Sequence, residues 1–285
     1  MALAQARMVA AMLGDECEVV EIQTSGDRAP REGGATPRQT GDKSRFVKEI
    51  EEALLRGEVD VAVHSAKDVP GLLPDGLEIA AVPRRANPRD VICGAASIDA
   101  LNAGARVGTA SVRRRSQLLA LRPELEIAEL RGNVDTRLRK LAEGGYDAIV
   151  LAGAGLERLG RPQDGVPVPV EQMVPAPGQG SLAIEIRADD DAARAAVIAI
   201  SDRAAVACLE AERECVIALE ATCDTPVGVL AECVGGDPRR LRMRAYAGAR
   251  DGSTWVRDDL EGGRDIGARV AERLLAAGAA DVLAS

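Results

Sequence analysis

Residues 59–76 read VDVAVHSAKDVPGLLPDG, and the fold prediction starts from this stretch. Three valines alternate along its first half with an alanine between them, a pattern typical of a strand that is apolar on both faces, as in a parallel sheet covered by helices. We predict the strand over 59–63. The loop at its carboxyl end, where open α/β sheets bind ligands, then holds four polar residues: His64, Ser65, Lys67 and Asp68. A simple turn with solvated side chains explains this stretch equally well.

Strand-like and helix-like segments alternate over the first two thirds of the chain, which predicts a parallel sheet wrapped by helices. Further strands are predicted at 77–82, 90–93, 106–109, 125–130, 146–151 and 181–186. Helices are predicted at 112–121, 134–143 and 154–159, and before the first strand around Phe46, Val47, Ile50 and Leu54. Residues 24–43 are polar and rich in Gly and Pro, which indicates a mobile loop or lid, or simple disorder.

Two short passages, VPRRANPRD at 82–90 and VPAPGQG at 174–180, bracket a complete αβ block. If both cross between domains, the block between them is inserted into the first domain, and a ligand-binding cleft lies between the two. The last third differs in character, with a long helix predicted at 203–220, short strands and a closing helix. It indicates a small separate α/β domain.

Composition excludes several classes of function. The net charge of −9, the pI near 4.9 and an aromatic content of 1% argue against nucleic acid or a membrane surface as a partner. The only histidine is His64, and the cysteines contain no Cys-x-x-Cys pair, so no metal site is expected. Scattered cysteines without a recognisable signal peptide favour a cytoplasmic protein. Chain length allows two or three domains with real cores.

Three strands of the middle block each end in a polar loop that opens a helix: GTAS before Val112, RGN before Val134 and AGAG before Leu156. Helix N-termini attract carboxylates and phosphates, and arginine forks bind carboxylates in bidentate fashion. Arginines accompany each helix start: Arg113 and Arg114, Arg131 and Arg137, and Arg158. Three such clusters in register favour a polyanion site over a solvated surface. Cys223 lies in the loop ATCDTP, where spacing alone favours an inert thiol.

A series of motifs carries a family resemblance. In order they are KSRFVKEIEEALL, VDVAVHSAKDVP, NPRDVIC, GTASVRRRSQLL, ELRGNVDTRLRKL, YDAIVLAGAGLERLG, VPAPGQGSLAIEIR and ALEATCDTPVG. Their pattern resembles that of porphobilinogen deaminase, also called hydroxymethylbilane synthase, from Lys43 to Gly228. The resemblance implies two hinged periplasmic-binding-protein-like α/β domains with a central cleft, plus a small C-terminal α/β domain. The expected domains are 1–83 with 181–199, then 87–176 as the inserted anion-binding domain, and 203–285.

The resemblance also implies a function. Family members are transferases that condense four porphobilinogen molecules head to tail, release ammonia and form the linear tetrapyrrole hydroxymethylbilane. Cys223 is then the covalent attachment point of a dipyrromethane cofactor, and Asp68 the catalytic carboxylate. Further cofactor-binding residues are implied at Lys67, Ser65, Lys43, Thr109, Ser111, Arg113, Arg114 and Arg131. Substrate-binding residues are implied at Arg137, Arg158, Gln179 and Phe46. A monomer without metal is expected.

Two departures from the family pattern stand out. Ala221 and Thr222 precede the cofactor cysteine, where family members have Gly-Gly or Ala-Gly. Family sequences also begin with a strand ending in Arg-x-Ser-Pro, whereas Met1 here directly precedes Ala2-Leu3-Ala4-Gln5. We therefore expect a first domain without its usual first strand. A truncated inactive form, or a non-catalytic hinged anion-binding module, is the alternative function.

Overall fold

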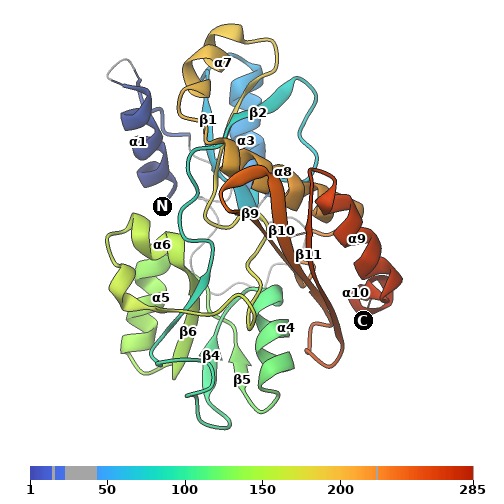
Figure 1. Cartoon of the computed structure of the whole chain (residues 1–285). Helices are drawn as coiled ribbons and strands as arrows, with labels where there is room; N and C mark the ends of the chain where they lie inside the picture. Colours follow the sequence, from blue (N-terminus) through green and yellow to red (C-terminus); the bar gives the residue numbers. More distant parts are fainter. Residues whose placement is uncertain (15–16, 23–43, 223, 285) are drawn as a thin grey trace.

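Three β-sheets organise the computed structural model, which describes residues 1–14, 17–22, 44–222 and 224–284. Figure 1 shows three units, one around each sheet, and helix α8 (Arg203–Ala218) lies between the first and the third. The first sheet lies at the top of that view, the second at the bottom, and the third at the right. The α/β fold class with a small third unit is confirmed. The domain limits given above stay a prediction.

The first sheet has the strand order β1–β8–β2, with β8 antiparallel to both neighbours. Its strands are β1 (Ala62–Ser65), β2 (Leu77–Ala81) and β8 (Leu182–Arg187). Its helices are α1 (Ala2–Leu13), α3 (Ser44–Leu55) and α7 (Asp191–Ile198). The prediction of parallel pairing is wrong here, because β8 returns from the second sheet and runs opposite to β1. The strand prediction of 59–63 was also misplaced, since pairing with β8 draws His64 and Ser65 into β1.

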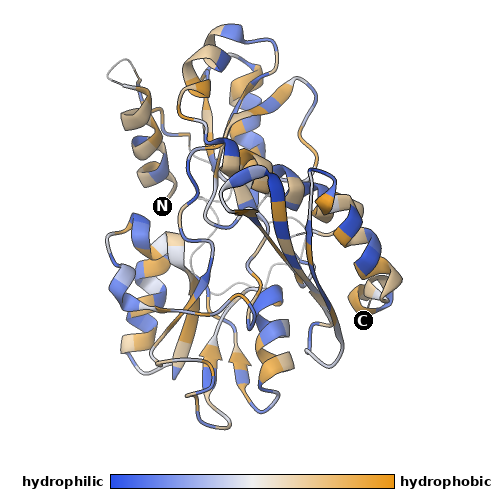
Figure 2. Ribbon diagram, viewed as in Figure 1, coloured by the Kyte–Doolittle hydropathy of each residue, from blue (hydrophilic) through white to orange (hydrophobic). Residues whose placement is uncertain are grey.

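The second sheet has the order β5–β4–β6–β3–β7 and is mixed. Its strands are β3 (Asp90–Cys93), β4 (Arg106–Gly108), β5 (Glu126–Ala128), β6 (Ala148–Ala152) and β7 (Val166–Pro167). Strand β4 is parallel to both β5 and β6, whereas β3 is antiparallel to β6 and β7. The helices are α4 (Val112–Leu121), α5 (Val134–Ala142) and α6 (Gly153–Arg158). The strands are largely hydrophobic in Figure 2, as expected for a covered sheet.

Two segments connect the first sheet with the second and meet at Gly180. The amide of Ala86 donates to the carbonyl of Gly180 at 3.1 Å. Gly180 has φ +89°, and a Cβ there would lie 2.5 Å from the carbonyl oxygen of Ala86. Only glycine fits this conformation and this close approach. The final glycine of the PGQG motif therefore lets the outgoing and returning segments lie side by side.

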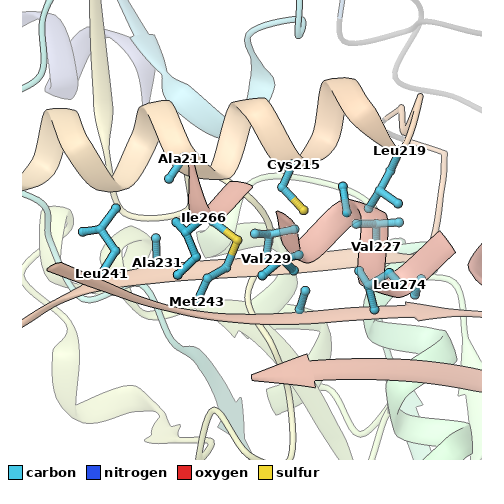
Figure 3. Close-up of a cluster of buried hydrophobic side chains, with 14 of the residues drawn as sticks. Ala211, Cys215, Leu219, Val227, Val229, Ala231, Leu241, Met243, Ile266 and Leu274 are labelled. Carbon is cyan, nitrogen blue, oxygen red and sulfur yellow. The ribbon is translucent and has the colours of Figure 1, made fainter. Parts of the chain in front are cut away.

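The third sheet is an antiparallel meander, β9 (Val227–Val234), β10 (Asp237–Gly248) and β11 (Trp255–Gly262). Helices α8 (Arg203–Ala218), α9 (Ile266–Ala276) and α10 (Ala279–Ala284) accompany it. The core between helices and sheet is shown in Figure 3, where Cys215 of α8, Met243 of β10 and Leu274 of α9 converge. Cys215 is fully buried there. It acts as a small hydrophobic residue, as its helical spacing indicates.

Leu274→Ala tests this core against its neighbour on the same helix. Leu274 is 1% exposed and Leu275 is 42% exposed. We expect Leu274→Ala to lower the free energy of unfolding by about 2–5 kcal/mol, because it leaves a cavity. Leu275→Ala is expected to change it by about 0.5 kcal/mol or less. Urea denaturation of both variants checks this, and equal effects would contradict the packing described.

Candidate active site

The carboxyl ends of three neighbouring parallel strands form one edge of the second sheet. Helices α4, α5 and α6 begin directly after β4, β5 and β6, as the sequence predicts. The side chain of Ser111 caps α4 by accepting the amide of Arg114 at 3.4 Å, and Asn133 caps α5 by accepting that of Thr136 at 2.9 Å. The chain itself thus satisfies one amide at each of these two helix starts, and the first turn of a helix has further N–H groups without a partner in the helix.

A buried carboxylate lies at the centre of this region. Asp90 at the start of β3 is fully buried and accepts hydrogen bonds from two arginines of α4. Arg113 Nη1 lies 2.7 Å from Asp90 Oδ2, and Arg114 Nη2 lies 2.8 Å from Oδ1. Gln179, from the returning segment, donates to the same Oδ1 at 3.0 Å. The Asp90 carboxylate therefore joins three parts of the chain: strand β3, helix α4 and the returning segment.

Electrostatics keep this carboxylate ionised. Burial alone raises the pKa of Asp90, but the Arg113 and Arg114 guanidiniums outweigh it and hold the pKa well below its ordinary value of 3.8. A carboxylate whose pKa is lower in the folded state than in the unfolded state stabilises the fold at every pH above its ordinary pKa. That contribution is lost only as the pH falls below the ordinary pKa toward the folded value. The network is therefore intact at neutral pH.

Arg113 and Arg114 are committed to contacts inside the protein. They are 4% and 6% exposed, and Arg114 also donates to the carbonyl of Val150 at 2.9 Å. Arg113 donates likewise to the carbonyl of Val174 at 2.7 Å. Asp90 thus occupies much of the fork of each residue, while Arg113 Nε is buried without a partner among the described residues. Gln179 is similarly enclosed at 1% exposure.

Arg137 and Arg158 differ from this pair. Each is half-buried, and burial is the main reason that its pKa is lowered. Arg137 donates to the carbonyl of Gly132 at 2.7 Å and Arg158 to that of Gly180 at 2.8 Å. Within the described part of the chain neither forms an ion pair with a carboxylate, and Arg158 Nε is buried without a partner. Partly desolvated cations of this kind suit an anionic ligand.

The other predicted residues of this edge vary in exposure. The Arg131 side chain is 75% exposed and pairs with Glu129 at 2.7 Å, which matches a solvated surface residue as well as a ligand contact. Thr109 is buried, and its hydroxyl accepts the amide of Ser111 at 3.1 Å. Thr109 thereby shapes the loop that starts α4.

The first sheet contributes the turn after β1. Lys67 and Asp68 lie in the 3-10 turn η1 (Ala66–Asp68) and are half-buried. Ser65 pairs with Gln5 of α1, whose Nε2 donates to Ser65 Oγ at 2.8 Å. A Cβ on Gly178 would lie 2.9 Å from the Lys67 amide nitrogen. The PGQG turn therefore packs directly on the turn that carries Lys67 and Asp68.

Some predicted residues lie outside the described part. These are Cys223, the side chain of Phe46 and the whole loop predicted at 24–43, which includes Lys43. Thr222 Oγ1 accepts the amide of Asp224 at 3.3 Å. The side chain of the threonine that departs from the family pattern thus accepts a hydrogen bond from the chain.

Three buried acids were missed by sequence reasoning: Asp90, Glu185 and Glu212, each fully buried. Glu212 of α8 binds Arg85 at 2.6 Å and accepts the Gly178 amide at 2.6 Å. Glu185 of β8 lies 2.8 Å from His64. Asp90 and Glu185 stand in otherwise apolar strands, DVIC and LAIEIR, and an acid in such a run was the available signal.

Comparisons with known proteins show the family of this chain. The family described as porphobilinogen deaminase, dipyromethane cofactor binding domain, matches residues 1–195, and the porphobilinogen deaminase C-terminal domain matches residues 206–276. A porphobilinogen deaminase of Brevibacillus brevis is 45% identical over 94% of this chain and 86% of its own. That of Thermus thermophilus is 43% identical over 100% and 95%. The chain belongs to the porphobilinogen deaminase family.

Solved structures show only weaker likenesses. A putative methionine-binding lipoprotein from Bacillus subtilis has 16% identity and a TM-score of 0.36, covering 54% of this chain and 74% of its own. That likeness is too low to bear on function. Across the described ranges, no group of three or more His, Cys, Asp or Glu residues could hold a metal ion. No helix there is long and apolar enough to cross a membrane.

Asp90→Asn tests the central carboxylate. Removing its charge leaves two buried guanidiniums without a counter-ion, so we expect a loss of about 3–5 kcal/mol in the free energy of unfolding at pH 7. The exposed Asp75 supplies the control, and Asp75→Asn is expected to cost about 0.5 kcal/mol or less. Denaturant titration measures both, and a near-neutral Asp90→Asn would show that the arginines find other partners.

Proposed function

We propose that this chain carries out the reaction of its family: it condenses four porphobilinogen molecules, releases ammonia and forms the linear tetrapyrrole hydroxymethylbilane. Family membership over nearly the whole chain is the observation that carries this proposal. The alternatives, a non-catalytic anion-binding module or an inactive form, are not favoured by relatives of this similarity. We further propose a cytoplasmic monomer with the three domains predicted from the sequence.

The residues of the site fit a dipyrromethane cofactor, which carries several carboxylates. Arg137 and Arg158 are partly desolvated cations without a carboxylate partner among the described residues, and helix starts lie at the same sheet edge. We assign these two arginines to carboxylates of the cofactor or the growing chain, together with Lys67, Ser65, Lys43 and Arg131. When bound through Cys223, the cofactor supplies the pyrrole end from which the chain grows.

Asp68 is proposed as the catalytic carboxylate. Loss of ammonia from porphobilinogen leaves positive charge spread over a pyrrole ring, and a fixed carboxylate stabilises such charge as it develops. Asp68 lies on a turn held from both sides, by β1 and by the PGQG segment. It is therefore suited to meet the reacting ring without reorganisation. Phe46 is proposed to pack near the incoming ring.

Arg113 and Arg114 take a different part in this proposal. Their bonds to Asp90 fix the start of α4 and the segment of Gln179. Thr109 and Ser111 complete the same loop. We propose that these residues form the wall of the anion site. The positive charge of Arg113 and Arg114 then attracts the bound carboxylates from within that wall.

Asp68→Asn keeps the side-chain shape and removes the charge. We expect turnover of porphobilinogen to fall about a hundredfold or more, with the fold intact, because a preorganised electrostatic contact is lost. Asp75→Asn, on a nearby exposed turn, is expected to match the parent. Steady-state assays with circular dichroism check both. Turnover of Asp68→Asn within a few-fold of the parent would remove Asp68 from the catalytic role.

Cys223→Ser tests the anchor of the cofactor. Among single Ser variants of the six cysteines, we expect this one alone to lose the covalent adduct in denaturing mass spectrometry. Cys17 is the control, because it is an exposed free cysteine. An adduct on another cysteine would reassign the anchor, and a parent chain without any adduct after incubation with porphobilinogen would favour the non-catalytic module.

A further inference from the structure

Three buried titratable residues lie next to the turn of Asp68 and have no part in the proposed reaction. His64 of β1, Glu185 of β8 and Glu51 of α3 are 5%, 0% and 6% exposed; we call them the His64 cluster. His64 Nε2 lies 2.8 Å from Glu185 Oε2. The two are diagonal neighbours across antiparallel strands, since Glu185 faces Ala62 and His64 faces Ala183. Helix α3 packs against both strands.

His64 is too enclosed to touch a substrate, yet it stands close to the reacting groups along the chain. Strand β1 continues without a break into η1, and the Ala66 amide donates to the Ser181 carbonyl at 3.1 Å. Ser65 contacts Gln5 of α1, while His64 lies on the alternate face of the strand. The position of the end of β1 therefore sets the position of Lys67 and Asp68.

The His64 cluster is not built for stability alone. Among the described residues, Glu51 Oε1 and Glu185 Oε1 are buried without a hydrogen-bond partner. Burial, and then repulsion by Glu185, raise the pKa of Glu51, while His64 opposes them. Apolar side chains would fill this space at lower cost than unsatisfied carboxyls. Arrangements that break a packing rule in this way are expected near functional sites.

Charges from every neighbouring element bear on the cluster. Helix α8 brings Arg213, which attracts Glu185 and donates to the Gly71 carbonyl at 2.7 Å. Glu185 lies against His64 and is attracted by Arg213. Ionisation of Glu51 adds a buried negative charge that Glu185 repels. The Glu51 carboxylate of α3 and the Glu185 carboxylate of β8 then repel each other, and both act on His64.

We propose that His64 is a positioning residue: through Glu185 it fixes the end of β1 and the turn of Asp68, and ionisation of Glu51 loosens this hold and slows turnover. The proposal rests on the proposed role of Asp68. Placement errors of about 1 Å in a reacting group cost up to about a hundredfold in rate. A small shift of β1 is therefore enough for a measurable effect.

Glu51→Gln in the holoenzyme is the decisive variant, since it removes the ionisation and keeps the shape. For a group whose pKa is raised in the folded state, stability falls as the pH rises from the ordinary value of 4.5 through the folded value. The variant is thus expected to be at least as stable as the parent at neutral pH. From about pH 5 to about pH 9, its kcat profile should lack the fall that accompanies Glu51 ionisation in the parent.

Glu52→Gln is the matched control, because Glu52 is the next residue of α3 and is exposed. It is expected to follow the parent profile. A Glu51→Gln profile that superimposes on the parent would overturn the role of Glu51. Asp68→Asn is measured in the same assay. If Asp68→Asn keeps its turnover, the catalytic assignment of Asp68 is wrong. If Asp68→Asn loses turnover and the Glu51→Gln profile still matches the parent, only the present inference is wrong.

Substitution of His64 tests the positioning itself. His64→Phe is expected to lower kcat about tenfold or more with KM nearly unchanged, and His64→Gln, which keeps a donor for Glu185, is expected to recover part of that loss. Covalent cofactor content by mass and the melting temperature are recorded for each. A fall in cofactor content or folded fraction that accounts for the whole loss of kcat would overturn the positioning role.

Discussion

The ionised carboxylate of Asp90 is the contact on which the arrangement of the first and second sheets depends. It begins β3, binds two arginines of α4 and accepts Gln179 from the segment that returns to the first sheet. Buried charge of this kind is tolerated only with well-placed partners, so each partner fixes the others. The start of α4, the outgoing segment and the PGQG turn are thus held together at the edge where the anion site is proposed.

Glu212 plays the equivalent part for the third unit. It binds Arg85 of the outgoing segment, the Gly178 amide of the returning segment and the Ala231 amide of β9. A second contact joins the third sheet to α4, since the hydroxyl groups of Tyr246 and Ser116 lie 2.7 Å apart. The unit that carries Cys223 is therefore tied to both connecting segments and to α4. In the proposed reaction, a chain anchored at Cys223 reaches Asp68 from there, so these ties would bear on function as well as stability.

The site combines two kinds of positive charge. Arg113 and Arg114 are paired with Asp90, whereas Arg137 and Arg158 have no carboxylate partner among the described residues and are partly desolvated. The first pair holds the framework together, and we propose that the second pair attracts carboxylates. We propose a similar supporting role for the His64 cluster, on the strand that leads into the turn of Asp68.

The sequence alone determined most helices and the three helix starts at one sheet edge, because local periodicity, caps and short motifs act within a few residues. It did not determine the antiparallel course of β8, the partners of Arg113 and Arg114, or the contact of His64 with Glu185. These partners come from other elements: Asp90 lies 23 residues from Arg113, and Glu185 lies 121 residues from His64. Only the folded chain brings such groups together, and burial then decides which charges pair with each other and which remain for a ligand.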